Sequence, residues 1–192
     1  EETNEYQKER VQQVSQNRNE ELIWFLEHKS VYTCGVNFNQ KDVLDKNVKI
    51  VKTNRGGKIT WHGPGQLICY FVIDISRRKK DIRKFITVIE NSIIETLKDF
   101  RISSFSDRKN IGIWVLDKKE EKKIAAIGFR VKKWIAFHGF SLNLSNNLNS
   151  YKKIIPCGIS DKGISKINNF KKIAKDKVIN RLKINLIKNL KY

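Results

Sequence analysis

The chain has 192 residues, of which 40% are hydrophobic and 10% are aromatic, and its formal net charge at pH 7 is +19. This length and apolar content predict one folded domain over 1–192 and exclude a wholly disordered chain. No apolar run reaches the roughly 18–20 residues of a membrane-spanning helix, so a membrane partner is not expected.

The positive charge predicts attraction to acidic partners. Lysines stand beside Asn and Ile throughout, as in Lys183-Ile184-Asn185, so a general compositional bias explains the charge equally well. Where the charge has a partner, acidic proteins are favoured over nucleic acid, because no nucleic-acid-binding motif accompanies it.

The cysteines Cys34, Cys69 and Cys157 form no CxxC pair. This favours a reducing compartment over a disulfide framework or a zinc site, and a cytoplasmic location is expected. The chain contains no methionine. We therefore expect the natural N-terminus to be missing, and an organellar targeting segment before residue 1 stays open.

The first half of the chain predicts one helix and several strands. Residues 3–18 are polar with a loose helical spacing of apolar side chains, which indicates a surface helix. Aromatic and branched residues gather in four later segments, which we expect to be strands. These segments are 22–28, 31–34, 49–53 and 67–75.

Two further helices carry the clearest periodicity. Over 81–100 the apolar residues fall on one face, and Asp81 is the expected N-cap. Over 175–191 a second stripe is formed by Val178, Leu182, Leu186 and Leu190.

Between these helices we expect strands over 111–116, 123–131 and 134–144, with hairpin turns at 117–122 and 132–133. Strands interrupted by well-defined helices predict an α+β fold, with a mostly antiparallel or mixed sheet and helices packed on it.

The segment 55–66 is the most distinctive of the chain. It holds four of the ten glycines and one of the two prolines, Pro64. Glycine allows close backbone approach and positive φ, and polar side chains such as Arg55 and His62 lie between the glycines. The sequence predicts a binding loop mounted on a sheet. A phosphate-binding P-loop is not expected, because the GxxxxGK[ST] pattern is missing and the loop leads into a strand.

Cys157 is the candidate nucleophile, since it stands between Pro156 and Gly158 in a loop. A nearby cation favours the reactive thiolate. Lys123 is a candidate partner because small residues follow it, but local sequence does not separate Lys122 from Lys123.

His62 and His138 both precede glycine. Each is a candidate base, substrate anchor or structural histidine, so the two compete with Lys123 for the role of base. No close pair of ligands has metal-binding spacing, so no metal is expected.

Three separated segments resemble the motifs of the octanoyltransferases of lipoate synthesis, in the same order along the chain. They are Arg55-Gly56-Gly57-x-x-Thr60-Trp61-His62-Gly63-Pro64-Gly65-Gln66, then Lys123-Ile124-Ala125-Ala126-Ile127-Gly128 leading to Phe137-His138-Gly139, then Pro156-Cys157-Gly158.

The resemblance implies the fold of biotin and lipoate protein ligases. It implies transfer of an octanoyl group from acyl carrier protein to a lysine of lipoyl domains, as the first step of endogenous protein lipoylation. The implied acceptors are the E2 subunits of 2-oxoacid dehydrogenases and the glycine cleavage H protein. A thioester donor is already activated, so neither ATP nor a metal cofactor is expected.

By position, the resemblance makes Cys157 the nucleophile of an acyl-enzyme. It makes Lys123, which directly precedes Ile-Ala-Ala-Ile-Gly, the residue that activates the thiol and carries the proton. His138 is assigned a supporting role. The implied pocket residues are Arg55, Gly56, Gly57, Lys58, Ile59, Thr60, Trp61, His62, Ala126, Ile127, Gly128, Gly139, Phe140 and Ser141.

Two other functions compete. An ATP-dependent lipoate ligase of the same fold would not need Cys157, and the His-Gly-Pro-Gly-Gln run speaks against it. A basic nucleic-acid-binding module has only the charge in its favour. The segment 116–122 is longer and more charged than the resemblance leads us to expect, so the pocket entrance near Lys123 is expected to differ.

Overall fold

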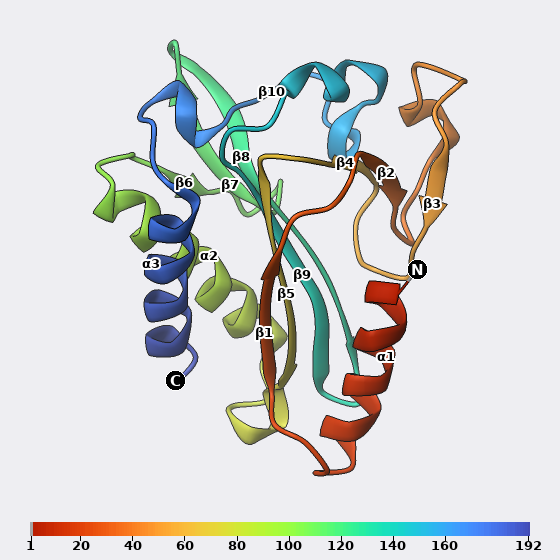
Figure 1. Ribbon diagram of the computed structural model, residues 1–192, viewed down its shortest axis with the longest axis vertical. Coiled ribbons are helices and arrows are strands. Elements are labelled where there is room, and N and C mark those ends of the chain that lie inside the picture. The colour runs from red at the N-terminus through yellow and green to blue at the C-terminus, as the bar shows by residue number, and fades with distance from the viewer. Residues whose placement is uncertain (1) are drawn as a thin grey trace.

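In the computed structural model, which describes residues 2–192, a large β-sheet carries helices on both of its faces (Figure 1). The helices are α1 (Glu2–Ser15), α2 (Ile82–Asp99) and α3 (Lys175–Asn189). The strands are β1 (Leu22–Leu26), β2 (Val31–Cys34), β3 (Ile50–Lys52), β4 (Ile59–His62), β5 (Gln66–Asp74), β6 (Phe105–Ser106), β7 (Ile113–Asp117), β8 (Glu120–Lys132), β9 (Ile135–Asn143) and β10 (Gly163–Ile164).

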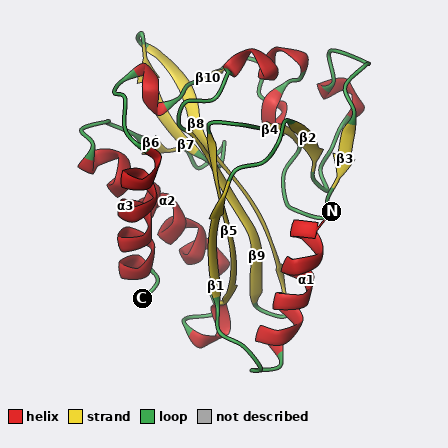
Figure 2. Ribbon diagram, viewed as in Figure 1, coloured by secondary structure: helices red, strands yellow, loops and turns green. Residues whose placement is uncertain are grey.

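The large sheet has the order β1-β5-β9-β8-β7-β6, and β10 lies beside β8. Strands β3, β2 and β4 form a second, small sheet. Among the strand pairs of residues 2–192, only β8–β10 and β2–β3 are parallel. The predicted α+β class with a mostly antiparallel sheet is therefore confirmed (Figure 2).

Helices α2 and α3 cover one face of the large sheet. The apolar stripe of α2 is buried, with Phe85, Ile89 and Ile93 fully inaccessible to solvent. The Asp81 side chain accepts a hydrogen bond from the Lys84 N–H at 2.9 Å, so the predicted N-cap is confirmed. The stripe of α3 lies in the same core.

Helix α1 lies on the opposite face of the sheet (Figure 1). Val14 packs there against Val72 of β5 and against Ile135 and Phe137 of β9. This second core is much smaller than the first, so α1 leaves part of the sheet face uncovered.

Strand β8 changes neighbours along its length. Its first half pairs with β7 as far as Ala125, and with β10 at Lys122 and Lys123. Its second half, 125–132, pairs with β9. Strand β7 lies along one edge of β8 only as far as Ala125. Beyond Ala125 no strand pairs with that edge, so it is an open sheet edge.

Three sequence expectations need correction. The segment 55–66 is not a continuous loop, because Ile59–His62 forms β4 and pairs with β2. The turn expected at 117–122 is confined to Lys118 and Lys119, which both have positive φ, and Glu120 already belongs to β8.

The next turn lies at Lys133 and Trp134, one residue later than expected, again with positive φ at both positions. The short strands β6 and β10 were not predicted, because two residues carry no readable alternation.

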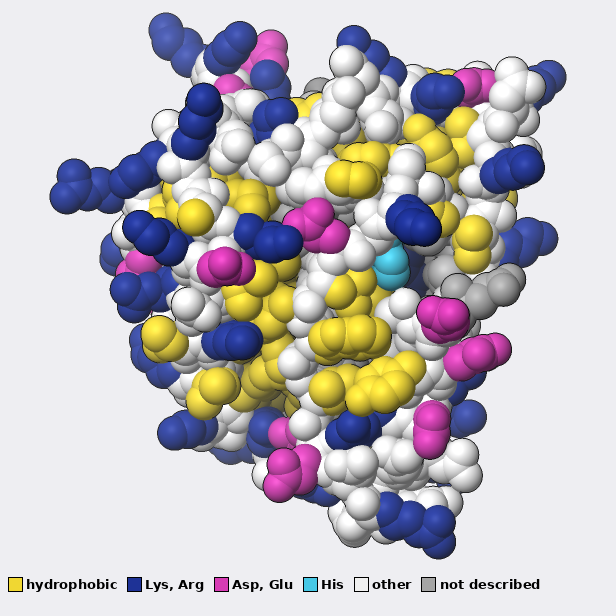
Figure 3. All heavy atoms as spheres, in the orientation of Figure 1, with side chains coloured by type: hydrophobic (Ala, Val, Ile, Leu, Met, Phe, Trp, Pro, Cys, Tyr) yellow, Lys and Arg dark blue, Asp and Glu magenta, His cyan; other side chains and the backbone are white. Residues whose placement is uncertain are grey.

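Within residues 2–192, none of the helices combines the length and the apolar character needed to cross a lipid bilayer. Most of the basic residues lie at the surface. Figure 3 shows lysine and arginine side chains projecting around the outline of the molecule.

Burial on α3 gives a direct test of this packing. Leu182→Ala removes a fully buried side chain, so we expect the free energy of unfolding to fall by about 2–5 kcal/mol. Ile187→Ala on the same helix, where the side chain is 55% exposed, should change it by no more than about 0.5 kcal/mol. Denaturant unfolding measures both, and equal losses would contradict the packing described.

Candidate active site

A cavity of about 700 Å³ lies beside the open edge of β8. The glycine loop, the first turn of α2 and the segment around Cys157 form its other walls. It collects most of the predicted site residues in one place. These are Arg55, Gly56, Gly57, Lys58, Thr60, His62, Lys123, Ala126, Ile127, Gly128, Gly139, Phe140, Ser141 and Cys157.

Cys157 lies in a 3₁₀ turn over Pro156–Gly158 and is half-buried. Its backbone is left-handed, with φ 57° and ψ 12°, a conformation that favours glycine. Gly158 follows with φ 67°, and a Cβ there would collide with the Lys58 ammonium group. The thiol therefore has a lysine beside its own turn, and of the three cysteines Cys157 alone lines the cavity.

Lys123 is buried, with 4% of its surface exposed. Its Nζ donates a hydrogen bond to the Ile111 carbonyl at 3.1 Å and lies 4.8 Å from the centre of the Trp114 ring. Lys122 instead forms an ion pair with Glu120 at 2.9 Å and does not line the cavity. The structure therefore separates the two lysines, and only Lys123 is directed toward the site.

Gly112 makes room for the Lys123 side chain. Its φ is 137°, and a Cβ there would meet the Ala125 carbonyl at 2.7 Å and the Lys123 Cε at 3.2 Å. The Gly112 N–H also faces the buried Glu90 carboxylate of α2, where burial raises the pKa of Glu90 and this hydrogen bond opposes the rise.

The glycine loop lies directly against β8. A Cβ on Gly56 would come within 2.7 Å of the Phe129 carbonyl, so only glycine permits this approach. The Arg55 guanidinium donates hydrogen bonds to the carbonyls of Gly56 and Thr33, each at 2.9 Å. Burial lowers the pKa of Arg55, and the negative charge of a Cys157 thiolate would act against that decrease.

Strand β4 divides the predicted pocket residues into two sets. Thr60 and His62 line the cavity, whereas Ile59 and Trp61 point away from it, because side chains alternate along a strand. Ile59 and Trp61 pack with Tyr151 and other apolar side chains in a small core beneath the site. The sequence analysis placed these two residues in the pocket, whereas in the structure they lie behind the cavity wall and do not line the cavity.

His62 is buried in a polar network. Its Nδ1 lies 2.8 Å from Gln66 Oε1, and Gln66 Nε2 in turn donates to Asn143 and to the Tyr151 hydroxyl. Burial lowers the pKa of His62 to about 3, so the ring is neutral near pH 7.

His138 lies outside the main cavity. Its φ is 72°, and its ring lies 4.9 Å from that of Phe137, so both rings occupy the α1 side of β9. His138 Nε2 is 2.6 Å from Asn54 Oδ1, and burial lowers the pKa of the ring to about 4. The structure does not bring His138 into the cavity with Cys157 and Lys123.

Several lining residues were missed by the sequence analysis. Ile68 and Tyr70 come from alternate positions of β5, and Ile82 and Ile86 come from the first turns of α2. The spacing of each pair places both members on one face, but only the fold shows that these two faces meet. Among residues 2–192, no three His, Cys, Asp or Glu side chains cluster as a metal site requires.

Comparison with known proteins identifies the family to which the chain is similar. Residues 1–187 match the family described as lipoyl protein ligase A/B catalytic domain. The octanoyltransferase of Wolbachia pipientis from Culex pipiens is 45% identical over 157 residues, covering 81% of this chain and 77% of its own length. The octanoyltransferase of Ehrlichia chaffeensis is 41% identical, covering 84% and 77%.

Solved structures agree on the fold. A lipoate-protein ligase A bound with ATP superposes with a TM-score of 0.72 at 15% identity, over 90% of this chain and 74% of that one. A biotin protein ligase from Aquifex aeolicus gives 0.54 at 15% identity, over 83% and 70%. The fold predicted from the sequence is therefore confirmed.

The buried neutral histidines predict a pH dependence of stability. Unfolded histidine binds a proton below about pH 6.5, whereas His62 and His138 stay neutral until about pH 3 and 4. The unfolded state therefore gains protons first, and stability falls as pH decreases from 6.5. His138→Gln, which can still bond Asn54, should reduce the slope of thermal midpoint against pH between 6.5 and 4.5. Equal slopes would contradict this.

Proposed function

This chain belongs to the family of lipoyl protein ligase A/B catalytic domains, and we propose that it is the octanoyltransferase of protein lipoylation. In this proposal the octanoyl donor is acyl carrier protein, and the acceptor is a lysine of a lipoyl domain. The observation that carries the proposal is the meeting of Cys157 and Lys123, from distant parts of the chain, in one partly apolar cavity.

The cavity suits an acyl chain. Ile68, Ile127 and Phe140 supply apolar wall, while Gly128 and Gly139 leave space beside it. Sites for small ligands commonly have volumes of about 300–1,000 Å³, a range that includes this cavity. The apolar tail would lie along the sheet, with its carbonyl carbon at Cys157.

The first half-reaction forms the acyl-enzyme. The Cys157 thiolate attacks the carbonyl carbon of the donor thioester and forms a new carbon–sulfur bond. The old carbon–sulfur bond breaks, and the departing donor thiolate takes a proton from the Lys123 ammonium group. Gly56 and Gly57 N–H groups donate to no acceptor in residues 2–192, so they can support the tetrahedral oxyanion.

The second half-reaction restores the enzyme. The neutral amine of the acceptor lysine attacks the Cys157 thioester, and its proton passes to the Lys123 amine. Amide formation releases the Cys157 thiolate, so the starting charges return. Because the donor is already a thioester, the proposal needs neither ATP nor a metal.

The local charge favours this mechanism. Arg55, Lys58 and Lys123 line the cavity together with Cys157, and positive charge near a thiol favours the thiolate. The Lys123 ammonium group is held between the Ile111 carbonyl and the Trp114 ring, so its position is fixed before substrate binds. His62 is neutral and bonded to Gln66, which suits a wall residue better than a base.

Incubation with octanoyl-acyl carrier protein alone should add the mass of one octanoyl group to the enzyme. Cys157→Ala should abolish that adduct and lower the rate of transfer by about a thousandfold or more. The matched control is Cys34→Ala, at a buried thiol outside the cavity. Intact mass spectrometry gives the result. The proposal would be contradicted if Cys157→Ala retained full transfer activity or if transfer required ATP, and either result would favour a ligase.

Lys123→Met should slow formation of the acyl-enzyme by about 10²–10⁴-fold, because it removes the proton carrier while keeping an unbranched side chain. Lys122→Met, next to it on β8 but paired with Glu120, should acylate at the wild-type rate. Single-turnover rates and thermal melts together separate a chemical defect from unfolding. Equal rates for the two variants would remove Lys123 from the mechanism.

A further inference from the structure

A second hollow lies between α1 and the end of β8, on the face of the sheet that α1 only partly covers. It consists of two adjoining cavities of about 550 and 310 Å³, which share Lys8, Asn54 and Phe137. We call it the α1–β8 groove. Val131 lines both this groove and the main cavity, so the two hollows adjoin at the β8 edge.

The groove has a strongly one-sided charge. Its lining includes the cations Lys8, Lys52, Arg130, Lys132 and Lys133, all of them exposed. None of these five forms an ion pair with a carboxylate of residues 2–192, and no carboxylate in that range lines the groove. The positive charge of the groove is therefore not balanced by acidic side chains of residues 2–192.

A buried polar side chain also faces the groove. Gln7 of α1 is 1% exposed and lines the smaller cavity, yet neither its Oε1 nor its Nε2 has a hydrogen-bond partner in residues 2–192. A buried amide without partners is costly, and a primary amide presents one acceptor and two donors. The backbone amide of an inserted peptide segment would satisfy both ends of this group.

We propose that the α1–β8 groove docks an acidic segment of the protein that donates the acyl group, an inference that rests on the function proposed above. Acidic side chains would meet the five cations, and the segment's backbone would bond Gln7. Complementary charge of this kind guides association and fixes orientation more than it adds affinity.

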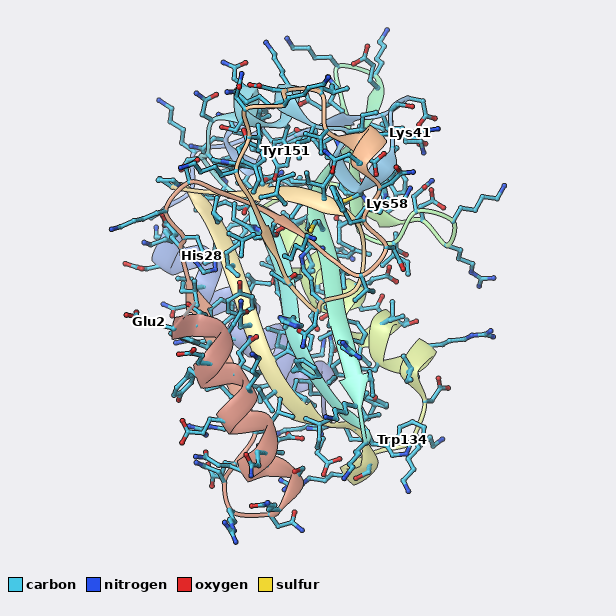
Figure 4. All side chains as sticks on the ribbon, turned by 90° about the vertical axis from the view of Figure 1, so that its right-hand side faces the viewer. Glu2, His28, Lys41, Lys58, Trp134 and Tyr151 are labelled. Carbon is cyan, nitrogen blue, oxygen red and sulfur yellow. The ribbon has the colours of Figure 1, made fainter. Side chains whose placement is uncertain are left out.

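The position of the groove favours the donor over the acceptor. Arg130 lies seven residues beyond Lys123 on β8, a distance of about 23 Å at the usual strand rise of about 3.3 Å per residue. In Figure 4, Lys58, whose ammonium group lies beside the Cys157 turn, is in the upper part of the molecule, and Trp134, just after the end of β8, is in the lower part. An acceptor lysine has only a four-carbon side chain, so its domain must sit at the thiol. An acyl carrier holds its thioester on a long prosthetic arm, so its body can dock farther away.

The test compares two charge reversals of equal size. Lys8→Glu with Lys133→Glu alters the groove. Lys118→Glu with Lys119→Glu alters the hairpin tip between β7 and β8, where both lysines have positive φ, as Lys133 does in the groove. Calorimetric titration with unacylated acyl carrier protein should show at least tenfold weaker binding by the groove variant and less than a twofold change for the control. Acylation by octanoyl-N-acetylcysteamine, a small uncharged thioester, should stay within twofold for both.

Each result bears on one proposal. Normal carrier binding by the groove variant, or equal weakening by both variants, would overturn the groove as a specific dock. Loss of lipoyl-domain binding with unchanged carrier binding would assign the groove to the acceptor and equally overturn it. If the wild-type protein accepts an octanoyl group from neither thioester, the proposed function fails, whereas the binding comparison still decides the groove.

Gln7→Leu separates a docking role from a structural one. Removal of an unpartnered buried amide should raise the thermal midpoint, while carrier binding weakens several-fold because the peptide contact is lost. A lower midpoint with unchanged carrier affinity would show that Gln7 serves the fold alone, and would overturn its part in the dock.

Discussion

The site depends on one constraint, the change of neighbours along β8. Strand β7 stops pairing at Ala125, so the rest of β8 has an open edge on that side. An open edge leaves backbone groups unpaired. Here the main cavity occupies that edge, and the glycine loop closes over it through Gly56 against the Phe129 carbonyl. Lys123 stands just before the change, where β7 and β10 still flank it, so the lysine is buried at the end of the open edge.

The same constraint explains which features the sequence could predict. Helix α2 was predictable with its cap, because its apolar stripe and Asp81 are local signals. Strand β4 could not be predicted, because Ile59–His62 is flanked by glycines and its pairing partner β2 lies far earlier in the chain. The motifs of 55–62, 123–128 and 156–158 predicted which residues belong together. They could not predict that Ile59 and Trp61 face a core, since that follows from a strand only the fold reveals.

The positively charged side chains have different surroundings in different parts of this molecule. Near Cys157 the cations are buried or fixed: Arg55 bonds two carbonyls, and Lys123 lies between a carbonyl and an indole ring. In the α1–β8 groove they are exposed and form no ion pair with a carboxylate of residues 2–192. Neither arrangement follows from composition, because the net charge of +19 is spread over the whole sequence. Burial and pairing are what distinguish the lysine that we propose takes part in the reaction from those that we propose bind a partner.

The left-handed backbone of Cys157 means that the conformation of this turn and the chemistry proposed for its thiol are independent of each other. With φ 57° between Pro156 and Gly158, this turn would accept glycine more readily than any residue with a side chain. The conformation of this turn therefore does not require the thiol, and a single substitution would remove the nucleophile that we propose while leaving the architecture intact. A related enzyme could lack the proposed nucleophile, keep the cavity and activate its substrate in another way, which makes this turn a point at which enzymes that share the fold can differ.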